Sequence, residues 1–381
     1  MNIFIFQSKI VAPNEGGISR MSKTYFDFLT QQGYNVWYLS LKQSRRMRLP
    51  EQLIVEGESR VEQHDSFCRL VKHYNIQLFI YQDGISPFQN FILRWARECG
   101  LKIIDIIHST LSGMYGINGH PLLSKIKPMI INMVVNKACN CFFMIKYGRC
   151  YREQFKLSDK VVLLSNKFRN EITYFTGWKD FSKFTSIHNP LTLDYPNKLN
   201  PEKKKIVLHV ALFNKSKRQD LLLDIWHIVE KQRPDWTLKI VGDGAEHDKL
   251  LSKKELLKLE HVDFEGFQDP QPYYDEASIF CLTSAFESFG LVLVEAMAFG
   301  CVPLAFSSFE TATDIISDGV DGILVTPFNV EEYAQQLIRL IDEDTLRKSM
   351  AQKAALKSRL FDKEKIMPKW LELIDDITCK K

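Results

Sequence analysis

Two glutamates flank a glycine in the segment with the clearest chemical potential. Glu287 and Glu295 lie on either side of Gly290, where an apolar run leads into a turn and then a predicted helix. The first backbone N–H groups of such a helix, at residues 289–292, have no partners within it and suit a diphosphate. The two carboxylates could accept hydrogen bonds from the hydroxyls of a sugar and a ribose. The plain structural alternative makes Glu287 a capping acid and Glu295 a solvated helix residue.

This segment resembles the nucleotide-sugar-binding signature of retaining glycosyltransferase family 4, within the group 1 glycosyltransferases. That signature reads E-x7-E, and its second glutamate opens an E-A-M-A-x-G-x-P run. The match covers Glu287, Phe289, Gly290, Glu295, Ala296, Met297, Ala298, Gly300 and Pro303. The resemblance implies that Glu287 faces the donor sugar and Glu295 the donor ribose. It also implies a donor-binding role for the start of the helix, at Phe289, Gly290 and Leu291.

A basic pair follows in the same resemblance. Lys217 and Arg218 come after a predicted strand and resemble the family's lysine-bearing segment, which contacts the donor diphosphate. A fixed cation there would stabilise the departing nucleotide, whose negative charge grows as the glycosidic bond breaks. A solvated basic helix start is the alternative, although the helix dipole disfavours it. Where the family usually has Gly-Arg, this chain has Ala211-Leu212, so Arg218 and Lys215 are the candidates to replace the second cation.

Two glycine turns complete the predicted donor site. Gly242 and Gly244 end a predicted strand as the family's glycine turn does, and would let the backbone approach the nucleotide. Gly16 and Gly17 follow the first strand and resemble the loop that lies across the donor phosphates. A plain tight turn is the alternative for the second pair.

His108 ends a predicted strand at residues 102–107, where family members often place a histidine near the transferred sugar. We therefore expect a catalytic group there, with a structural histidine as the equal alternative. The resemblance makes Glu287, His108 and Lys217 the catalytic candidates.

The chain predicts an α/β protein of two domains. Short runs rich in Val, Ile and Phe alternate with helical periodicity, which is typical of βαβ units and parallel sheets. The predicted strands are 2–6, 35–41, 77–82, 102–107, 141–145 and 160–165, then 205–212, 237–241, 262–267, 279–283, 302–306 and 322–326, with helices such as 18–32, 87–99 and 122–137. The resemblance implies a GT-B fold, in which two Rossmann-like domains face each other across a cleft.

We expect the domain boundary near residue 190. Residues 1–190 then form an N-terminal acceptor-binding domain, and residues 191–362 a C-terminal domain that binds the nucleotide sugar. The tail at 363–381 has helical spacing and is expected to pack back on the N-terminal domain.

Composition narrows the class of protein. With 45% hydrophobic and 25% charged residues, the chain matches a folded globular protein. It shows neither a signal peptide nor an apolar run long enough to span a membrane, and its eight cysteines form no CxxC pair. We therefore expect a cytoplasmic protein without disulfides. The single D-x-D match, at 342–344, falls between two predicted helices, so we expect neither a metal nor another cofactor.

Charge is uneven along the chain. Residues 1–190 carry a net charge of +11 and the remainder −7. Basic residues at 45–48 and 125–156 lie among apolar ones, as in segments that dock on anionic membranes, and a solvated charged face is the equal alternative. No nucleic-acid-binding motif accompanies them.

The expected function is transfer of a sugar, most simply from a UDP-sugar, to a glycan or lipid-linked glycan acceptor with retention of configuration. Cell-surface polysaccharide or lipopolysaccharide synthesis would use such a peripheral enzyme at the inner face of the membrane. Two alternatives stay open: a UDP-sugar 2-epimerase of the same fold, and a non-catalytic sugar-nucleotide-binding protein.

Overall fold

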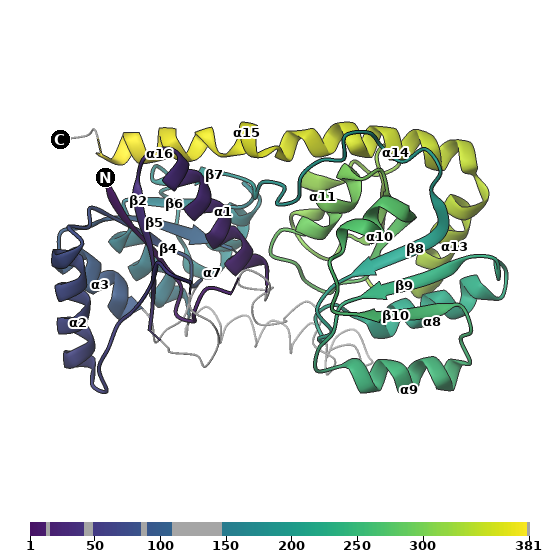
Figure 1. Cartoon of the computed structure of the whole chain (residues 1–381), viewed down its shortest axis with the longest axis horizontal. Helices are drawn as coiled ribbons and strands as arrows, with labels where there is room; N and C mark the ends of the chain where they lie inside the picture. Colours follow the sequence, from purple (N-terminus) through teal and green to yellow (C-terminus); the bar gives the residue numbers. More distant parts are fainter. Residues whose placement is uncertain (13–15, 42–48, 85–89, 109–146, 379–381) are drawn as a thin grey trace. The chain divides into compact units, whose positions relative to one another are not determined.

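The computed structural model describes residues 1–12, 16–41, 49–84, 90–108 and 147–378 (Figure 1). These residues form two compact units. The first comprises the described residues up to 192 together with 366–378, and the second comprises residues 193–365. The divisions thus fall at residues 192 and 365, where the sequence predicts 190 and 362. The acceptor and donor roles of the two units stay predictions.

The first unit is built on a seven-stranded parallel sheet. Its strand order is β3-β2-β1-β4-β5-β6-β7. The strands are β1 (Asn2–Phe6), β2 (Asn35–Ser40), β3 (Gln52–Ile54), β4 (Leu78–Tyr81), β5 (Lys102–Ile107), β6 (Lys160–Leu163) and β7 (Phe184–Ser186). β4 is buried along its whole length, because helices cover both faces of such a sheet. The order reverses between β1 and β4, so polar residues that follow these strands share one edge of the sheet.

Helices connect these strands. They are α1 (Gly17–Gln31), α2 (Arg60–His73), α3 (Asn90–Glu98) and α7 (Phe168–Thr176), with residues 147–157 also largely helical. The last helix, α16 (Pro368–Thr378), belongs to this unit by its contacts. Its Trp370 ring lies 4.6 Å from that of Tyr25 on α1, and its Asp376 pairs with Lys160 at 2.5 Å. Helix α16 therefore contacts α1 and β6 and helps to stabilise the first unit.

The second unit repeats the design with six parallel strands. Their order is β10-β9-β8-β11-β12-β13. The strands are β8 (Lys204–Val210), β9 (Thr237–Val241), β10 (Val262–Gly266), β11 (Ala277–Leu282), β12 (Val302–Phe306) and β13 (Ile323–Val325). Here the order reverses between β8 and β11. Open α/β sheets bind ligands beyond the carboxyl ends of the strands at such a reversal.

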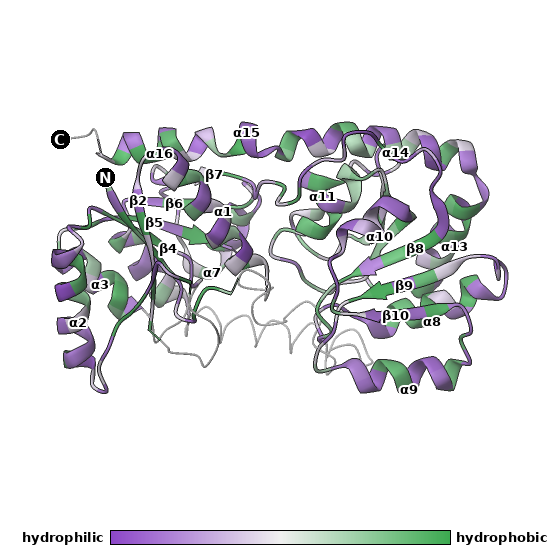
Figure 2. Cartoon of the chain, in the orientation of Figure 1, coloured by the Kyte–Doolittle hydropathy of each residue, from purple (hydrophilic) through white to green (hydrophobic). Residues whose placement is uncertain are grey.

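Eight helices of residues 193–365 accompany this sheet, and the one at Leu291–Ala298 is buried along most of its length. They are α8 (Gln219–Glu230), α9 (His247–Leu257), α10 (Gln271–Glu276), α11 (Leu291–Ala298), α12 (Ala312–Ile315), α13 (Val330–Asp342), α14 (Asp344–Ser358) and α15 (Lys363–Ile366). Hydrophobic and hydrophilic stretches alternate along α9 in this unit and along α16 in the first (Figure 2). The main core lies between α8, α13 and the sheet, around Trp226 and Tyr333.

The prediction of an α/β protein with two parallel sheets is confirmed. Two short strands, β3 and β7, were not predicted, because three residues carry too little pattern to be recognised. The predicted strand at 141–145 and helix at 122–137 lie outside the described residues. No helix in the described part of the chain is both long and apolar enough to cross a membrane.

Candidate functional site

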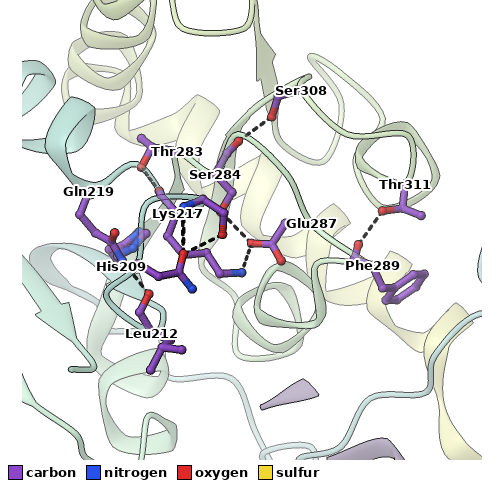
Figure 3. Close-up of polar contacts among 12 residues, drawn as sticks. His209, Leu212, Lys217, Gln219, Thr283, Ser284, Glu287, Phe289, Ser308 and Thr311 are labelled. Atoms are coloured by element: carbon purple, nitrogen blue, oxygen red, sulfur yellow. Dashed lines mark hydrogen bonds and ion pairs between the residues drawn. The ribbon is translucent and has the colours of Figure 1, made fainter. Parts of the chain in front are cut away.

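The predicted donor residues gather where the order of the second sheet reverses. Lys217 lies between β8 and α8, and Glu287 lies between β11 and α11. Because β8 and β11 are neighbours, their carboxyl ends bring these two turns together. Figure 3 shows both side chains pointing toward one another. The sequence predicted each residue separately, and the order of the strands in the sheet brings the two residues together.

An ion pair joins the two residues. Lys217 Nζ lies 2.7 Å from Glu287 Oε1, and the side chains are only 21% and 9% exposed. The Ser284 hydroxyl donates a second hydrogen bond to the same oxygen at 2.7 Å. Thr283 Oγ1 donates to the carbonyls of Lys217 and Arg218, so the two turns are tied to each other. The cation and the carboxylate are thus held in place with little water around them.

The helix start beside this pair has the geometry of an anion site. Gly290 precedes α11 with φ 92°, a left-handed conformation that favours glycine, and no side chain caps the helix. The carbonyl of buried Phe289 accepts a hydrogen bond from Thr311 Oγ1 at 2.8 Å. Leu291 begins the helix and is half-buried. The first turn of α11 therefore presents uncapped N–H groups from a fixed loop.

Glu295 has a different environment from Glu287. It lies on α11 with no exposed surface, and its Oε2 accepts a hydrogen bond from Tyr274 at 3.0 Å. The carboxylate is thus held inside the second unit by a partner from α10. Its contact with a donor ribose stays a prediction.

The glycine turn after β9 is needed for packing of the backbone. A Cβ at Gly242 would come within 2.0 Å of the Ala211 carbonyl oxygen, and one at Gly244 within 2.5 Å of the Phe213 carbonyl oxygen. Both glycines also have positive φ, 138° and 155°. They allow the segment after β8 to pack against the turn, and contact with a nucleotide stays a prediction.

Arg218 is engaged in a local pair. Its guanidinium bonds both carboxylate oxygens of Asp220, at 2.9 and 3.0 Å, and lies 5.6 Å from the ring centre of Phe328. Leu212, where the family resemblance implies arginine, is 57% exposed. Lys215 is exposed. To contact a diphosphate, Arg218 would first have to break its pair with Asp220, whereas Lys215 would only have to move its exposed side chain.

His209 on β8 is a site residue that the sequence analysis missed. It is fully buried, its Nδ1–H donates to the Cys281 carbonyl at 2.9 Å, and its Nε2 has no partner among the described residues. Burial lowers the pKa of His209 to about 4, and the nearby charge of Lys217 adds to this effect. The imidazole is neutral at neutral pH. One polar residue within the apolar run of β8 was the only available signal.

The first unit carries a polar network at its own reversal. His108 follows β5, and its Nε2 donates to Gln82 Oε1 at 3.1 Å. Gln82 follows β4, and its Nε2 donates to Ser22 Oγ on α1 at 2.9 Å. All three side chains are buried, and burial lowers the pKa of His108 to about 4. Neutral His108 is therefore held in one tautomer, with the proton on Nε2.

Gly16 and Gly17 open α1 beside this network. Gly16 has φ 148°, and the helix has neither a side-chain cap nor an acidic residue in its first turn. Among the described residues, a Cβ at either glycine would meet nothing within 4 Å. The turn thus leaves open space over the helix start, and its contact with donor phosphates stays a prediction.

The remaining predicted groups are placed as follows. The basic residues at 45–48 and 125–146 lie outside the described residues, whereas Arg152 donates to the Thr176 carbonyl at 2.7 Å. Asp342 and Asp344 of the D-x-D match pair with Arg233 and Arg347. Across the described ranges, no three His, Cys, Asp or Glu side chains are grouped as metal ligands.

Comparison with known proteins gives this geometry a family context. Residues 193–357 match the family "Glycosyl transferases group 1". An uncharacterised glycosyltransferase of Haemophilus influenzae is 35% identical over 56% of this chain, and the chain spans 60% of that relative's length. The amylovoran biosynthesis glycosyltransferase AmsD of Erwinia amylovora is 27% identical over 95% of this chain and 97% of its own.

The solved structures agree on the fold. The Anabaena protein Alr3699/HepE, crystallised with UDP and glucose, has a TM-score of 0.75 at 17% identity and covers 99% of this chain and 100% of its own. The GT-B fold is thereby confirmed. The match to the family of group 1 glycosyl transferases lies within the second unit, at residues 193–357, and the solved structure shows the fold alone.

Proposed function

We propose that the protein is a retaining hexosyltransferase. It moves a sugar from a nucleotide sugar, a UDP-sugar in the simplest case, to a glycan or lipid-linked glycan acceptor. One observation carries the proposal: Lys217 Nζ and Glu287 Oε1 lie 2.7 Å apart at the sheet reversal, where such folds bind ligands. A cation and a carboxylate at one point match the two parts of the donor, its diphosphate and its sugar.

In the proposed mechanism, Lys217 and Glu287 pair with each other until the donor binds and replaces this ion pair. When the donor binds, its diphosphate accepts hydrogen bonds from Lys217 and from the N–H groups of the first turn of α11. Glu287 then accepts hydrogen bonds from the sugar hydroxyls. Lys217 and the helix terminus then stabilise the charge on the departing nucleotide. The acceptor attacks on the same face, and a leaving phosphate oxygen takes its proton, so the mechanism needs neither a protein nucleophile nor a metal.

His108 is proposed to assist from the first unit. It is buried and neutral, and Gln82 holds its Nε2–H. A neutral imidazole can accept a hydrogen bond from a sugar hydroxyl without placing a second positive charge in the site. The first unit would then bind the acceptor, and the second the donor.

The biological setting is also proposed. AmsD, which aligns with nearly the whole chain, is named for amylovoran biosynthesis, and this supports a role in surface polysaccharide or lipopolysaccharide synthesis. The UDP in the Anabaena structure supports UDP as the nucleotide. The net charge of +11 on residues 1–190 supports peripheral attachment to the anionic inner face of the membrane from the cytoplasm.

A donor screen tests the proposal. Thermal stability is measured with UDP-, GDP- and ADP-sugars, and a donor at 100 times its Kd should add about 2.7 kcal/mol of stability. The hit is then incubated with EDTA, and nucleotide release is measured with wild type, Lys217→Gln and the charge-matched control Lys249→Gln. We expect wild type and the control to release nucleotide slowly, and Lys217→Gln to release no nucleotide.

Other outcomes separate the alternatives. Tight donor binding with neither transfer nor hydrolysis would identify a binding protein. Release of a free epimer without any acceptor would identify an epimerase. If no nucleotide sugar at millimolar concentration stabilises the wild type, the donor site is wrongly assigned.

A further inference from the structure

Two cysteine sulfurs meet in the first unit, away from the residues discussed above. Cys68 lies on α2, and Cys99 directly follows α3, which packs beside α2 (Figure 1). Their Sγ atoms are 3.2 Å apart, and both side chains are half-buried. By contrast, Cys281 and Cys301 are fully buried inside the second unit. Small reagents can therefore reach the Cys68–Cys99 pair more readily than these two core thiols.

The distance is short enough for a disulfide. A disulfide bond measures about 2.05 Å, so the two sulfurs must approach by only about 1.2 Å, a movement that small side-chain rotations can supply. The two residues lie on neighbouring helices of one compact unit, so the link would not have to bring distant parts of the chain together.

A histidine stands beside one of the sulfurs. His64 is one helical turn before Cys68 on α2, and its Nε2 lies 3.6 Å from Cys68 Sγ. The same nitrogen is 3.0 Å from Glu98 Oε2, and Nδ1 is 3.6 Å from Asp65 Oδ1. The Cys68 sulfur and two carboxylates thus lie around one imidazole, which can take the proton that Cys68 loses on becoming a thiolate.

The two sulfurs are not equivalent. Burial, together with the neighbouring Cys68 sulfur, raises the pKa of Cys99 to about 12. Cys99 therefore stays a thiol while Cys68 is reduced, and Cys68 is the sulfur that attacks first. Once Cys68 is oxidised, it no longer carries the charge that opposes ionisation of Cys99.

We propose that Cys68 and Cys99 form a dithiol site that low-molecular-weight disulfides oxidise to an intramolecular disulfide. The Cys68 thiolate attacks one sulfur of a reagent RSSR. This attack forms Cys68–S–S–R and expels RS⁻, and the expelled RS⁻ takes the proton from His64. Cys99 then attacks the Cys68 sulfur, and the second RS⁻ leaves as RSH with the proton that Cys99 gives up. The protein loses two electrons and two protons, and one RSSR becomes two RSH.

Oxidised glutathione is the probe that tests this. The reduced full-length protein, in buffer with EDTA, is treated with the probe, and intact mass and a peptide map are recorded. We expect a mass lower by two hydrogen atoms, one linked peptide pair containing residues 68 and 99, and a raised thermal midpoint. Cys150→Ser, which removes another half-buried cysteine, should still form the link.

Single variants separate the two steps. Cys99→Ser should stop at a stable glutathione adduct on Cys68, and Cys68→Ser should leave Cys99 largely unmodified. His64→Gln should slow alkylation of Cys68 near neutral pH, because the thiol loses the neighbouring imidazole that takes its proton. Circular dichroism confirms that each variant is folded. A folded wild type that gives separate adducts or no modification at these positions, or a Cys68→Ser variant that reacts as fast as wild type, would overturn the proposal.

Discussion

Lys217 Nζ and Glu287 Oε1 lie 2.7 Å apart although 70 residues separate them in sequence. The two opposite charges form an ion pair, and both side chains are largely shielded from water. A pair of this kind is costly to break from one side only, because the remaining charge loses its partner. In the proposed function, a bound donor would avoid that cost, since it would offer a negative group to Lys217 and hydroxyl donors to Glu287.

Replacement of Lys217 and of Glu287 should therefore have different effects on binding. Lys217→Gln is expected to weaken UDP and UDP-sugar alike, by roughly 10- to 100-fold, since a hydrogen bond to a charged group contributes about 1.5–3 kcal/mol. Glu287→Gln should weaken the UDP-sugar but not UDP, because only the sugar needs the carboxylate. Titration calorimetry with both ligands measures this. Equal losses for UDP and UDP-sugar in Glu287→Gln would contradict the assigned role.

A second prediction concerns the proton on His108. Burial lowers the pKa of His108 to about 4, below its value in the unfolded chain, so this residue removes stability as pH falls from about 6.5 to 4. Gln82→Glu places a carboxylate at Nε2 and should raise the pKa of His108. The loss of stability on acidification should then be smaller.

NMR titration of the histidine ring signals measures this pKa directly, with Gln335→Glu at an exposed position of α13 as the control. If the His108 signal titrates identically in wild type and Gln82→Glu, the hydrogen bond between the two side chains is not formed in solution.

The sequence was informative where chemistry follows from local pattern. Continuous apolar runs predicted the buried strands, and the turns after β8 and β11 predicted Lys217 and Glu287. Parallel sheets make such predictions strong, because every strand ends at the same edge.

The rest of the site depends on contacts between distant segments. Gln82 and Ser22 are 60 residues apart, and neither lies in a motif that marks it as the partner of His108. The burial of Glu295 beneath Tyr274 likewise needs the packing of α10 against α11. Residue spacing cannot show which face of a short apolar helix is covered when both faces are apolar.

Asp105 gives a prediction for how stability changes between acidic and neutral pH. It is fully buried on β5, and burial raises its pKa to about 7, although Gln154 Nε2 donates to both carboxylate oxygens, at 3.0 and 2.9 Å. The folded state thus keeps a proton that the unfolded chain releases near pH 4. Stability should fall as pH rises from about 4 to 7, by up to roughly 4 kcal/mol from this residue alone.

Asp105→Asn removes that dependence. Its amide is neutral at every pH, and Gln154 can turn its Oε1, which has no partner among the described residues, toward the new N–H. The variant should be more stable than wild type at pH 8 and no more stable at pH 4, as measured by urea unfolding at both values. Equal effects at the two pH values would show that burial does not raise the pKa of Asp105 in the folded protein.

Gly242 should be the least replaceable glycine of the second unit. An added Cβ would lie 2.0 Å from the backbone oxygen of Ala211, a residue whose N–H donates to the Val241 carbonyl at the end of β9 at 3.1 Å. Gly319 is the matched control, because it also has positive φ, 71°, but a Cβ there would meet nothing within 4 Å. Gly319→Ala should cost about 1 kcal/mol of unfolding free energy, the strain of a left-handed residue.

Gly242→Ala should cost roughly 3 kcal/mol or more, because steric overlap with backbone adds to the strain. Urea unfolding followed by tryptophan fluorescence measures both variants, since Trp226 and Trp236 lie in the core of the same unit. The comparison also bears on function. If Gly242→Ala matched the control in stability yet lost donor binding, the glycine would be required by the nucleotide rather than by the Ala211 backbone.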